Sequence, residues 1–390
     1  MEDQKNSRKP KNLLVNRRLS INMPQNKKQH YVPKLYFRFF SKDDKNINLY
    51  NLKSRKLFVN VPFSPQCYED YFYSKNPEIE KSNSQLEAKF KEIIDKVIKN
   101  RNLSDLTHQD YGYLLEFLLY QWGRTSQARF DSKQQTKLIV DKVMKKMMLE
   151  DASLAKKGLT KEDIENVKIT WPVDHEVRML YCLAGIPLLS DLIPAILINN
   201  TKTDFLFSDN PVILHNTYFR DKEGIGATGF QSHGLQVFCP LNSKVSIMLY
   251  DKNCYQVPVQ EGYVLQIGNE QDVDAINKLQ LYNCYQNIYF SDENQSGYVR
   301  ILHTSVGDPK KGEHKVEFLP FHKGDGKTSK VAHFYTTGIE YKLKLSFVKI
   351  TVNAKLIGRC RNAEIVQEFE KFMDDVFKKA EEKKLSPVIA

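Results

Sequence analysis

The sequence predicts an α+β fold, with a helical middle region, a β-rich second half and a C-terminal amphipathic helix. Three observations support this class. Apolar residues recur at helical spacing across residues 84–149, short β-branched or aromatic runs follow residue 203, and a last apolar stripe lies near the C-terminus. With 390 residues, 41% of them hydrophobic, the chain has enough apolar side chains to bury a core.

The N-terminal third is predicted to change from strands to helices. Residues 30–40 are dense in aromatic side chains, and residues 47–52 and 56–61 are short strand-like runs. An apolar stripe over residues 84–98, with Lys and Glu on the other side, predicts an amphipathic helix. A second helix is expected over residues 105–130. Because its middle is apolar on nearly every side, we expect it at the centre of the core.

The next stretch is predicted to be helical as well. Residues 132–149 alternate Lys clusters with apolar positions, and Thr160 is placed to cap a short helix in an exposed connection. The longest apolar run lies within residues 174–199 and contains Asp191 and two prolines. Because proline interrupts a helix and the run carries a charge, we expect a buried pair of helices and no membrane span.

The second half is predicted to consist mainly of strands around two helices. The helices are expected over residues 271–285 and 362–382, each with one apolar face. The expected strands are residues 203–207, 236–240, 244–250, 263–267, 287–290, 298–303, 315–319, 331–336 and 341–351.

Charge divides the chain into three predicted parts. The formal net charge is +11, but residues 1–28 hold eight basic and two acidic residues, a net +6, and residues 301–390 hold seventeen basic and twelve acidic residues, a net +5. We therefore expect a basic N-terminal arm (residues 1–28), a neutral α+β core domain (residues 29–300) and a basic, β-rich extension that ends in a helix (residues 301–390). A basic arm binds phosphates of a nucleic acid or is a solvated tail.

Motifs and composition disfavour several classes of protein. The N-terminus has no continuous apolar run of the secretory kind, and the six cysteines are scattered without a CxxC pair. We therefore expect a cytoplasmic protein with reduced cysteines. The common phosphate-loop, dinucleotide, zinc-protease and nucleophile-elbow motifs are absent, and no His, Asp and Glu cluster has metal-ligand spacing. We predict no metal, no cofactor and no membrane partner.

The first candidate group for chemistry is His30 with Arg38. His30 begins the run His-Tyr-Val-Pro, and Arg38 follows eight residues later. A histidine fixed by a following Val-Pro can act as a general base, and a nearby arginine can bind a phosphate or an oxyanion. The same two side chains can also tie a loop to the fold through hydrogen bonds.

The second candidate group is Gln121 with Arg124, which share a face of the expected helix because they are three residues apart. An arginine among apolar residues needs an anionic partner, since burying an unpaired charge is costly. Asp209, another carboxylate of the core or a substrate phosphate can serve. A structural ion pair and a binding site both remain open.

The third candidate is Asp209, in a Ser-Asp-Asn-Pro run that directly follows an expected strand. Polar side chains at the end of a core strand commonly line clefts. The same residues also form an ordinary turn in which the Asp oxygen accepts from the backbone two residues on. The turn is the simpler explanation.

These motifs resemble a large bacterial family catalogued only as a domain of unknown function. The likeness rests on QHYVP at residues 29–33 with YFRFF at residues 36–40, on the Gln121 to Arg124 helix and on FSDNPV at residues 207–212, and it spans residues 27–295. It implies a prokaryotic cytoplasmic protein; such families often occur among mobile or defence genes, an association that carries no mechanism. It also implies that five residues converge on one pocket: His30, Arg38, Gln121, Arg124 and Asp209.

We therefore predict an intracellular effector that acts on nucleic acid, RNA in particular, or on a nucleotide, as a metal-independent, ribonuclease-like enzyme. His30 would be the acid/base group, with Arg38 and Arg124 as phosphate clamps. Gln121 and Asp209 would orient the reacting groups. Two alternatives stay open: a non-catalytic module that binds nucleic acid or a partner protein with its basic ends, including the C-terminal helix, and a nucleotide sensor that uses the same pocket without turnover.

Overall fold

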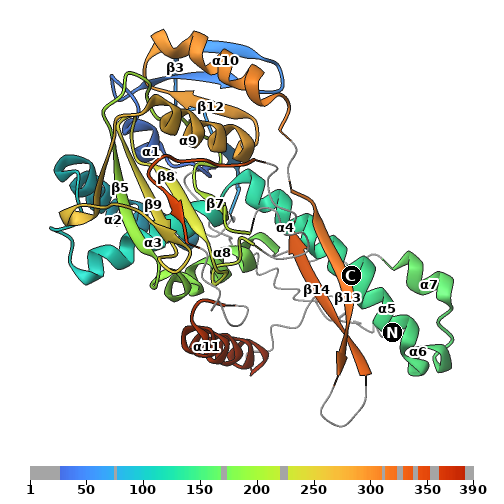
Figure 1. The fold of residues 1–390 in the computed structure, drawn as a ribbon. Helices are drawn as coiled ribbons and strands as arrows, with labels where there is room; N and C mark the ends of the chain where they lie inside the picture. Colours follow the sequence, from blue (N-terminus) through green and yellow to red (C-terminus); the bar gives the residue numbers. More distant parts are fainter. Residues whose placement is uncertain are drawn as a thin grey trace, which may run out of the picture.

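The computed structural model describes residues 27–73, 77–167, 174–219, 227–309, 312–322, 328–336, 341–351 and 360–382. It confirms the predicted α+β class (Figure 1). Most of the predicted basic arm, residues 1–26, lies outside the described residues.

A five-stranded sheet forms the centre of the molecule, in the order β11–β5–β9–β8–β7. β11 and β5 are parallel, and the other neighbours are antiparallel. Both faces of the sheet are buried: Ile196 and Ile198 of β5 belong to one hydrophobic cluster, Ala195 and Leu197 to another. This explains why the strands are continuous apolar runs. The strands are β5 (Ile193–Asn199), β7 (Ile213–His215), β8 (Gln236–Pro240), β9 (Val245–Tyr250) and β11 (Val264–Ile267).

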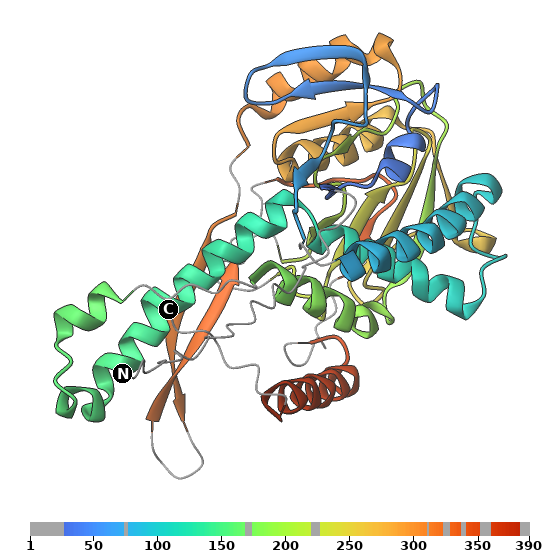
Figure 2. The same cartoon turned by 180° about the vertical axis from the view of Figure 1, so that it is seen from behind.

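Helices cover both faces of this sheet (Figures 1 and 2). On one face lies α3 (His108–Gly123), packed against α2 (Pro77–Asn100) and α8 (Asp174–Ala184); on the other lies α9 (Glu270–Asn283). The α3–α8 contact requires a glycine, because a Cβ atom at Gly123 would lie 2.6 Å from Sγ of Cys182.

A second, antiparallel sheet in the order β3–β2–β12–β6 supports the N-terminal segment. α1 (Lys34–Arg38) packs its aromatic side chains between this sheet and α3, and α10 (Ser296–Val306) covers the opposite face. A short ladder joins β1 (Lys28–His30) to β4 (Tyr68–Asp70). The four strands of the sheet are β2 (Asn46–Asn51), β3 (Lys56–Pro62), β6 (Phe207–Ser208) and β12 (Asn287–Phe290).

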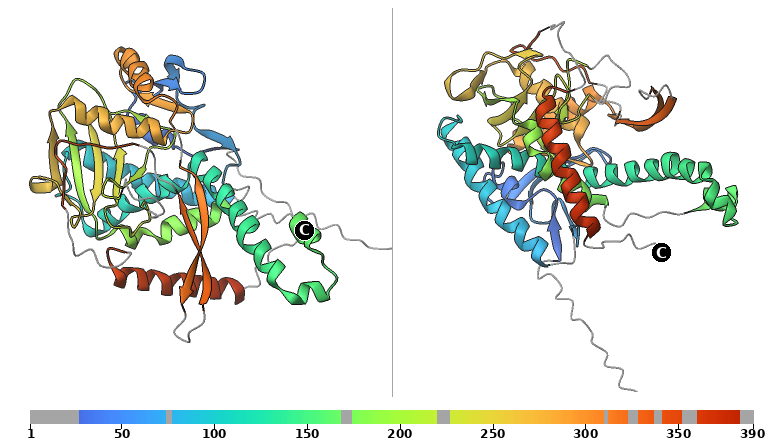
Figure 3. Two further views of the ribbon diagram at one scale, coloured as in Figure 1. Left: turned by 45° about the vertical axis from the view of Figure 1, so that its right-hand side comes forward. Right: turned by 90° about the horizontal axis from the view of Figure 1, so that it is seen from below.

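A helical arm, distinct from the basic N-terminal arm, projects away from the two sheets (Figures 1 and 3). α4 (Ser126–Ile139) continues through a π-helical turn, Val140–Met144, into α5 (Lys145–Glu150). The hairpin of β13 (His314–His322) and β14 (Thr328–Thr336) packs against α4. The arm ends in two short helices, α6 (Ala152–Lys156) and α7 (Lys161–Asn166), and Thr160 caps α7 as predicted.

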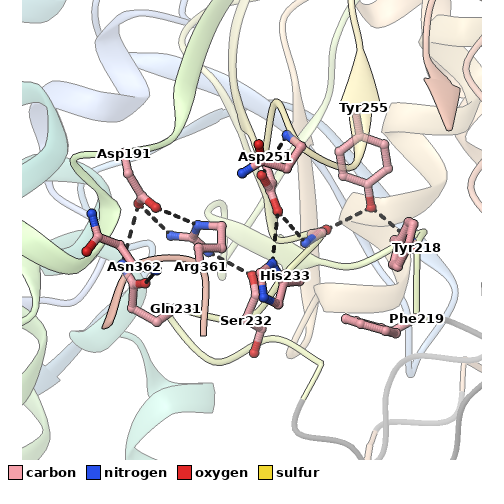
Figure 4. Close-up of polar contacts among 12 residues, drawn as sticks. Asp191, Tyr218, Phe219, Gln231, Ser232, His233, Asp251, Tyr255, Arg361 and Asn362 are labelled. Carbon is pink, nitrogen blue, oxygen red and sulfur yellow. Dashed lines mark hydrogen bonds and ion pairs between the residues drawn. The ribbon is translucent and has the colours of Figure 1, made fainter. Parts of the chain in front are cut away.

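The C-terminal helix α11 (Ala363–Glu382) is fastened to the core through Arg361 (Figure 4). The Arg361 guanidinium bonds the Asp191 carboxylate at 2.9 and 3.1 Å and also donates to the carbonyls of Ser232, Phe230 and Leu188. Ile365, Val366 and Phe369 then pack against the main hydrophobic cluster. The remaining short elements are β10 (Tyr255–Gln256) with β15 (Lys349–Ile350), and the 3-10 helices Ile186–Leu189, Glu261–Tyr263 and Glu293–Gln295.

The prediction of a helix pair over residues 174–199 is wrong. After α8 and a 3-10 turn, residues 193–199 form β5, the second strand of the central sheet. A short apolar run that is buried on both faces cannot be assigned to helix or strand by periodicity alone. Pro194 is tolerated because β11 pairs with β5 only from Ile196 onward. No helix in the described part of the chain is long and apolar enough to cross a membrane.

Three further expectations are corrected. The helix expected over residues 105–130 breaks at Arg124, the C-cap of α3, and Thr125 caps a new helix, α4. Residues 298–303, expected as a strand, lie in α10, because Val299, Leu302 and His303 are buried at helical spacing. Within residues 341–351, only Lys349–Ile350 forms a ladder.

Candidate functional site

A pocket of about 660 Å³ opens between β1, α1 and α2. Three of the five predicted site residues line it: His30, Arg38 and Arg124. Gln121 and Asp209 are not among its lining residues. The lining also includes four lysines that the prediction did not name: Lys27, Lys28, Lys34 and Lys91.

His30 is the last residue of β1, and its half-buried ring lies at the pocket. Its Nε2 atom is 3.0 Å from the carbonyl oxygen of Ser64. A neutral imidazole that donates from Nε2 keeps a lone pair on Nδ1. Burial lowers the pKa of His30, and the charges of Lys34 and Arg124 add to this effect. The ring is therefore neutral at physiological pH, as a general base requires.

Arg124 is almost fully buried and is held by protein groups. Its Nε donates to the Tyr73 hydroxyl at 2.6 Å, and Nη2 donates to the His30 carbonyl at 2.7 Å. Nη2 also forms an ion pair with Oε1 of Glu87 at 2.8 Å. Of the partners left open by the sequence, a protein carboxylate other than Asp209 pairs with Arg124, namely Glu87 of α2. Nε and Nη2 thus hold the Tyr73 side chain and the His30 backbone, while Nη1 has no partner among the described residues of this pocket.

Gln121, about one helical turn before Arg124 on α3, also holds the backbone of the QHYVP segment. Its Nε2 donates to the Tyr31 carbonyl at 3.0 Å. Gln29, on the other side of His30, accepts from the Tyr73 backbone N–H at 2.7 Å. The QHYVP segment is therefore fixed to α3 through its carbonyl groups and to the loop after β4 through Gln29. Gln121 is therefore a positioning residue that does not itself line the pocket.

Asp209 fastens the turn between α9 and β12. Its carboxylate accepts from the backbone N–H groups of Tyr285, Gln286 and Asn287 at 2.7, 2.8 and 3.0 Å. Three such bonds compensate a carboxylate that is 1% exposed. The next residue, Asn210, accepts from the Thr125 hydroxyl at 2.8 Å, which links this turn to the start of α4. Asp209 is therefore a structural group. Its partners are residues 285–287, far away in the sequence, and not the backbone two residues later as in the turn that the sequence suggested.

The cationic side of the pocket comes from β1 and α1. Lys34 and Arg38 are one turn apart on α1 and are exposed, and neither forms an ion pair within the described residues. Lys27 pairs with Asp70 at 2.9 Å, and the Lys28 ammonium lies 4.8 Å from the centre of the Tyr68 ring. Lys34 could have been found from the sequence, since it lies four residues before Arg38.

The residues that face this cationic side come from α2, and sequence reasoning missed them. Glu80, Asn83, Ser84 and Glu87 recur at intervals of three and four and line the pocket. Ser84 and Glu87 belong to the predicted helix, on which charged residues of the polar face are the rule, whereas Glu80 and Asn83 lie before its predicted start because α2 begins at Pro77. Within the described residues, no group of three or more His, Cys, Asp or Glu side chains is placed to hold a metal ion.

A second pocket, of about 390 Å³, lies between the end of α1 and the β8–β9 turn. Its charges are largely used within the protein. Lys244 is 2.8 Å from Asp204, and Lys42 is 3.2 Å from Asp292. The first pocket is therefore the better candidate for a ligand.

Fold and site together define an α+β protein whose N-terminal strand and helix carry a cationic pocket. A family model described as a protein of unknown function, DUF4238, matches residues 28–294, and the chain belongs to this family. The match includes the three motif segments and excludes α10, the β13–β14 hairpin and α11. No curated protein and no solved structure matches the chain.

Proposed function

We propose that the protein acts on RNA or a nucleotide as a metal-independent, ribonuclease-like enzyme. The observation that carries this proposal is a neutral, partly buried histidine in a pocket edged by unpaired cations. His30 supplies the base, while Lys34 and Arg38 supply positive charge for a phosphate. Gln121 and Arg124 donate to the carbonyls of Tyr31 and His30 and so hold the backbone beside the His30 ring. Arg124 also lines the pocket, where its Nη1 adds positive charge for a phosphate.

The reaction consistent with these groups is an internal transfer at phosphorus. His30 takes the proton of the ribose 2′-hydroxyl, and the 2′-oxygen forms a bond to phosphorus as the bond to the 5′-oxygen breaks. The departing 5′-oxygen takes a proton from water, and the other product carries a 2′,3′-cyclic phosphate. Lys34 and Arg38 stabilise the charge that develops on the phosphoryl oxygens.

The proposed function also gives a role to the end of the basic arm. Lys27 and Lys28, its last two residues, line the pocket beside His30. The basic arm and the pocket are therefore parts of one surface at this point. Lys27 and Lys28 therefore add to the positive charge at the pocket, and binding of a polynucleotide there would weaken with salt.

Purified full-length protein should be incubated with labelled RNA, and with DNA of the same sequence, in the presence of a chelator. We expect RNA fragments with 2′,3′-cyclic phosphate ends and no cut DNA, because DNA lacks the 2′-hydroxyl. His30→Ala should reduce the rate by about 100-fold or more, the usual contribution of a general base. His108→Ala, at an exposed histidine outside the pocket, is the matched control. Unaltered cleavage by His30→Ala would refute the enzyme proposal.

A nucleotide sensor is the second candidate, and one observation favours it. Among the described residues that line the pocket, His30 is the only histidine, so no second imidazole is available as the general acid. If no RNA is cut, a nucleotide that raises the melting temperature of the wild-type protein and not of Lys34→Gln/Arg38→Gln would support the sensor.

A further inference from the structure

The two sides of the pocket differ in chemical character. One side, from β1 and α1, carries Lys28, Lys34 and Arg38. The other side comes from α2, where Lys91 is paired with Asp95; we call its residues Glu80, Asn83, Ser84 and Glu87 the α2 wall. A phosphate is attracted to the first side and repelled by the carboxylates of the second. The α2 wall therefore suits an uncharged part of the same ligand that carries hydrogen-bond donors.

Asn83 offers an unused donor on this wall. The side chain is 8% exposed, and its Oδ1 accepts from the Tyr120 hydroxyl at 2.5 Å. Its Nδ2 has no hydrogen-bond partner in the described structure. An amide hydrogen without an acceptor costs free energy in a buried position. Asn83 lines the pocket, so this buried donor without a partner is the α2 group that we assign to an acceptor atom of a ligand.

Glu80 offers an unused acceptor one turn away on the same helix. Across the part of the chain that the structure describes, its carboxylate forms no ion pair and no hydrogen bond. Burial raises the pKa of Glu80, and the neighbouring Glu87 carboxylate adds to the shift. A ligand group that donates a hydrogen bond would stabilise the charged carboxylate. Glu87 is less available for this role, because it is paired with Arg124.

We propose that the α2 wall recognises the base of a nucleotide through an exocyclic amino group next to a ring nitrogen. Glu80 accepts from the amino group, and Asn83 Nδ2 donates to the ring nitrogen. Cytosine presents this pair as its 4-amino group and N3, and adenine as its 6-amino group and N1. Uracil inverts it, with O4 and N3–H at the corresponding atoms. Guanine inverts it at O6 and N1–H but presents its 2-amino group beside N3, so guanine is not a clean negative control. The inference rests on the proposed function, since it assumes that the pocket holds a nucleotide.

The test is the affinity of the full-length protein for CMP, AMP, UMP and GMP, measured by calorimetry at one salt concentration. We expect CMP and AMP to bind about fivefold to a hundredfold more tightly than UMP, the discrimination typical of a matched pair of hydrogen bonds. Inorganic phosphate should bind more weakly than CMP.

Two variants test the assignment of the two residues. Glu80→Gln gains a donor and should bring the ratio of the CMP and UMP affinities close to one. Asn83→Asp keeps an acceptor for Tyr120 and loses the donor, so it should weaken CMP more than UMP. Glu92→Gln changes the same charge at an exposed position of α2 outside the pocket and should leave all four affinities unchanged.

The outcomes separate this inference from the proposed function. Equal affinities for the four nucleotides would overturn base recognition by the α2 wall, and so would a ratio of CMP to UMP affinity that Glu80→Gln does not alter. Neither result would contradict the proposal that the pocket binds a nucleotide. Failure of every nucleotide and of RNA to bind would overturn the proposed function, and base recognition with it.

Discussion

Residues 29–38 contribute to two neighbouring regions that use their polar groups in opposite ways. In the first, the motif framework of Gln29, Gln121, Arg124 and Asp209, each side chain is nearly fully buried and bonds to backbone or side-chain groups of the protein. In the second, the pocket, the ring of His30 is half-buried, while Lys34 and Arg38 are exposed without ion pairs in the described structure.

The comparison shows that the polar residues of one motif have two different roles. Buried polar residues are costly unless they are paired, so their presence in an apolar sequence marks a fixed arrangement of the backbone. Groups that act on a ligand must keep unused donors, acceptors or charge. His30 belongs to both regions, because its carbonyl accepts from Arg124 while its ring lies in the pocket. The framework thus determines where the ring is held.

Replacement of Arg124 by Met is expected to have the largest effect on the framework. The change leaves the Glu87 carboxylate without its ion pair and removes one hydrogen bond each from the Tyr73 hydroxyl and the His30 carbonyl, which still bond to each other at 2.8 Å. Breaking a buried ion pair in this way costs about 3 kcal/mol or more in the free energy of unfolding. Urea denaturation would measure it. Arg124→Lys keeps the charge and should lose less. A change below about 1 kcal/mol for Arg124→Met would mean that the framework does not stabilise the fold.

The sequence predicted the residues of the two regions better than it predicted their roles. The resemblance implied that five residues converge on one pocket, and three of them, His30, Arg38 and Arg124, line the pocket described above. The partner of Arg124 was missed because Glu87 lies on the polar face of α2, where a glutamate is unremarkable. Its pairing depends on how α2 packs against α3, and no local pattern encodes that contact.

The fold shows the same limit. Strands bounded by Gly, Pro, Asn and Asp were located closely, as for β8 and β12, because turn residues act locally. β5 was mistaken for a helix, since its apolar run has no period when both faces are buried. The long-range bonds of Asp209 to residues 285–287 could not be foreseen, because they join segments that only the tertiary fold brings together.

The loss of stability at acid pH provides a second test, at a buried histidine that lies next to a partner of the framework. His175 is buried beside Tyr73, and burial together with Arg129, Arg178, Arg124 and Lys133 lowers its pKa to about 3. The unfolded chain binds this proton near pH 6.5, so the stabilisation is complete above that pH and is lost as the pH falls toward 3. The loss is at most about 1.4 kcal/mol per pH unit for one group.

His175→Phe should therefore flatten the loss of stability between pH 6 and 4, by about 2 kcal/mol at pH 5 at most. Urea denaturation at several pH values would measure this. His108→Phe, at an exposed position of α3, should leave the pH profile unchanged. If the wild type and His175→Phe lose stability equally as the pH falls, groups other than His175 cause that loss.

The smallest effect on stability is expected in the pocket, where removal of charge should alter binding alone. Lys34→Gln/Arg38→Gln should change the free energy of unfolding by less than about 0.5 kcal/mol, because both side chains are exposed. The affinity for single-stranded RNA should fall about tenfold, and the slope of log affinity against log salt should decrease by about 1.4 for two lost phosphate contacts. Lys56→Gln/Lys99→Gln removes the same charge from exposed positions outside the pocket and should leave the affinity close to wild type.

If both double variants weaken RNA binding equally, net charge and not the pocket attracts the ligand. If Lys34→Gln/Arg38→Gln destabilises the fold as much as Arg124→Met, the pocket and the framework are one structural unit, and the division of labour between them is wrong.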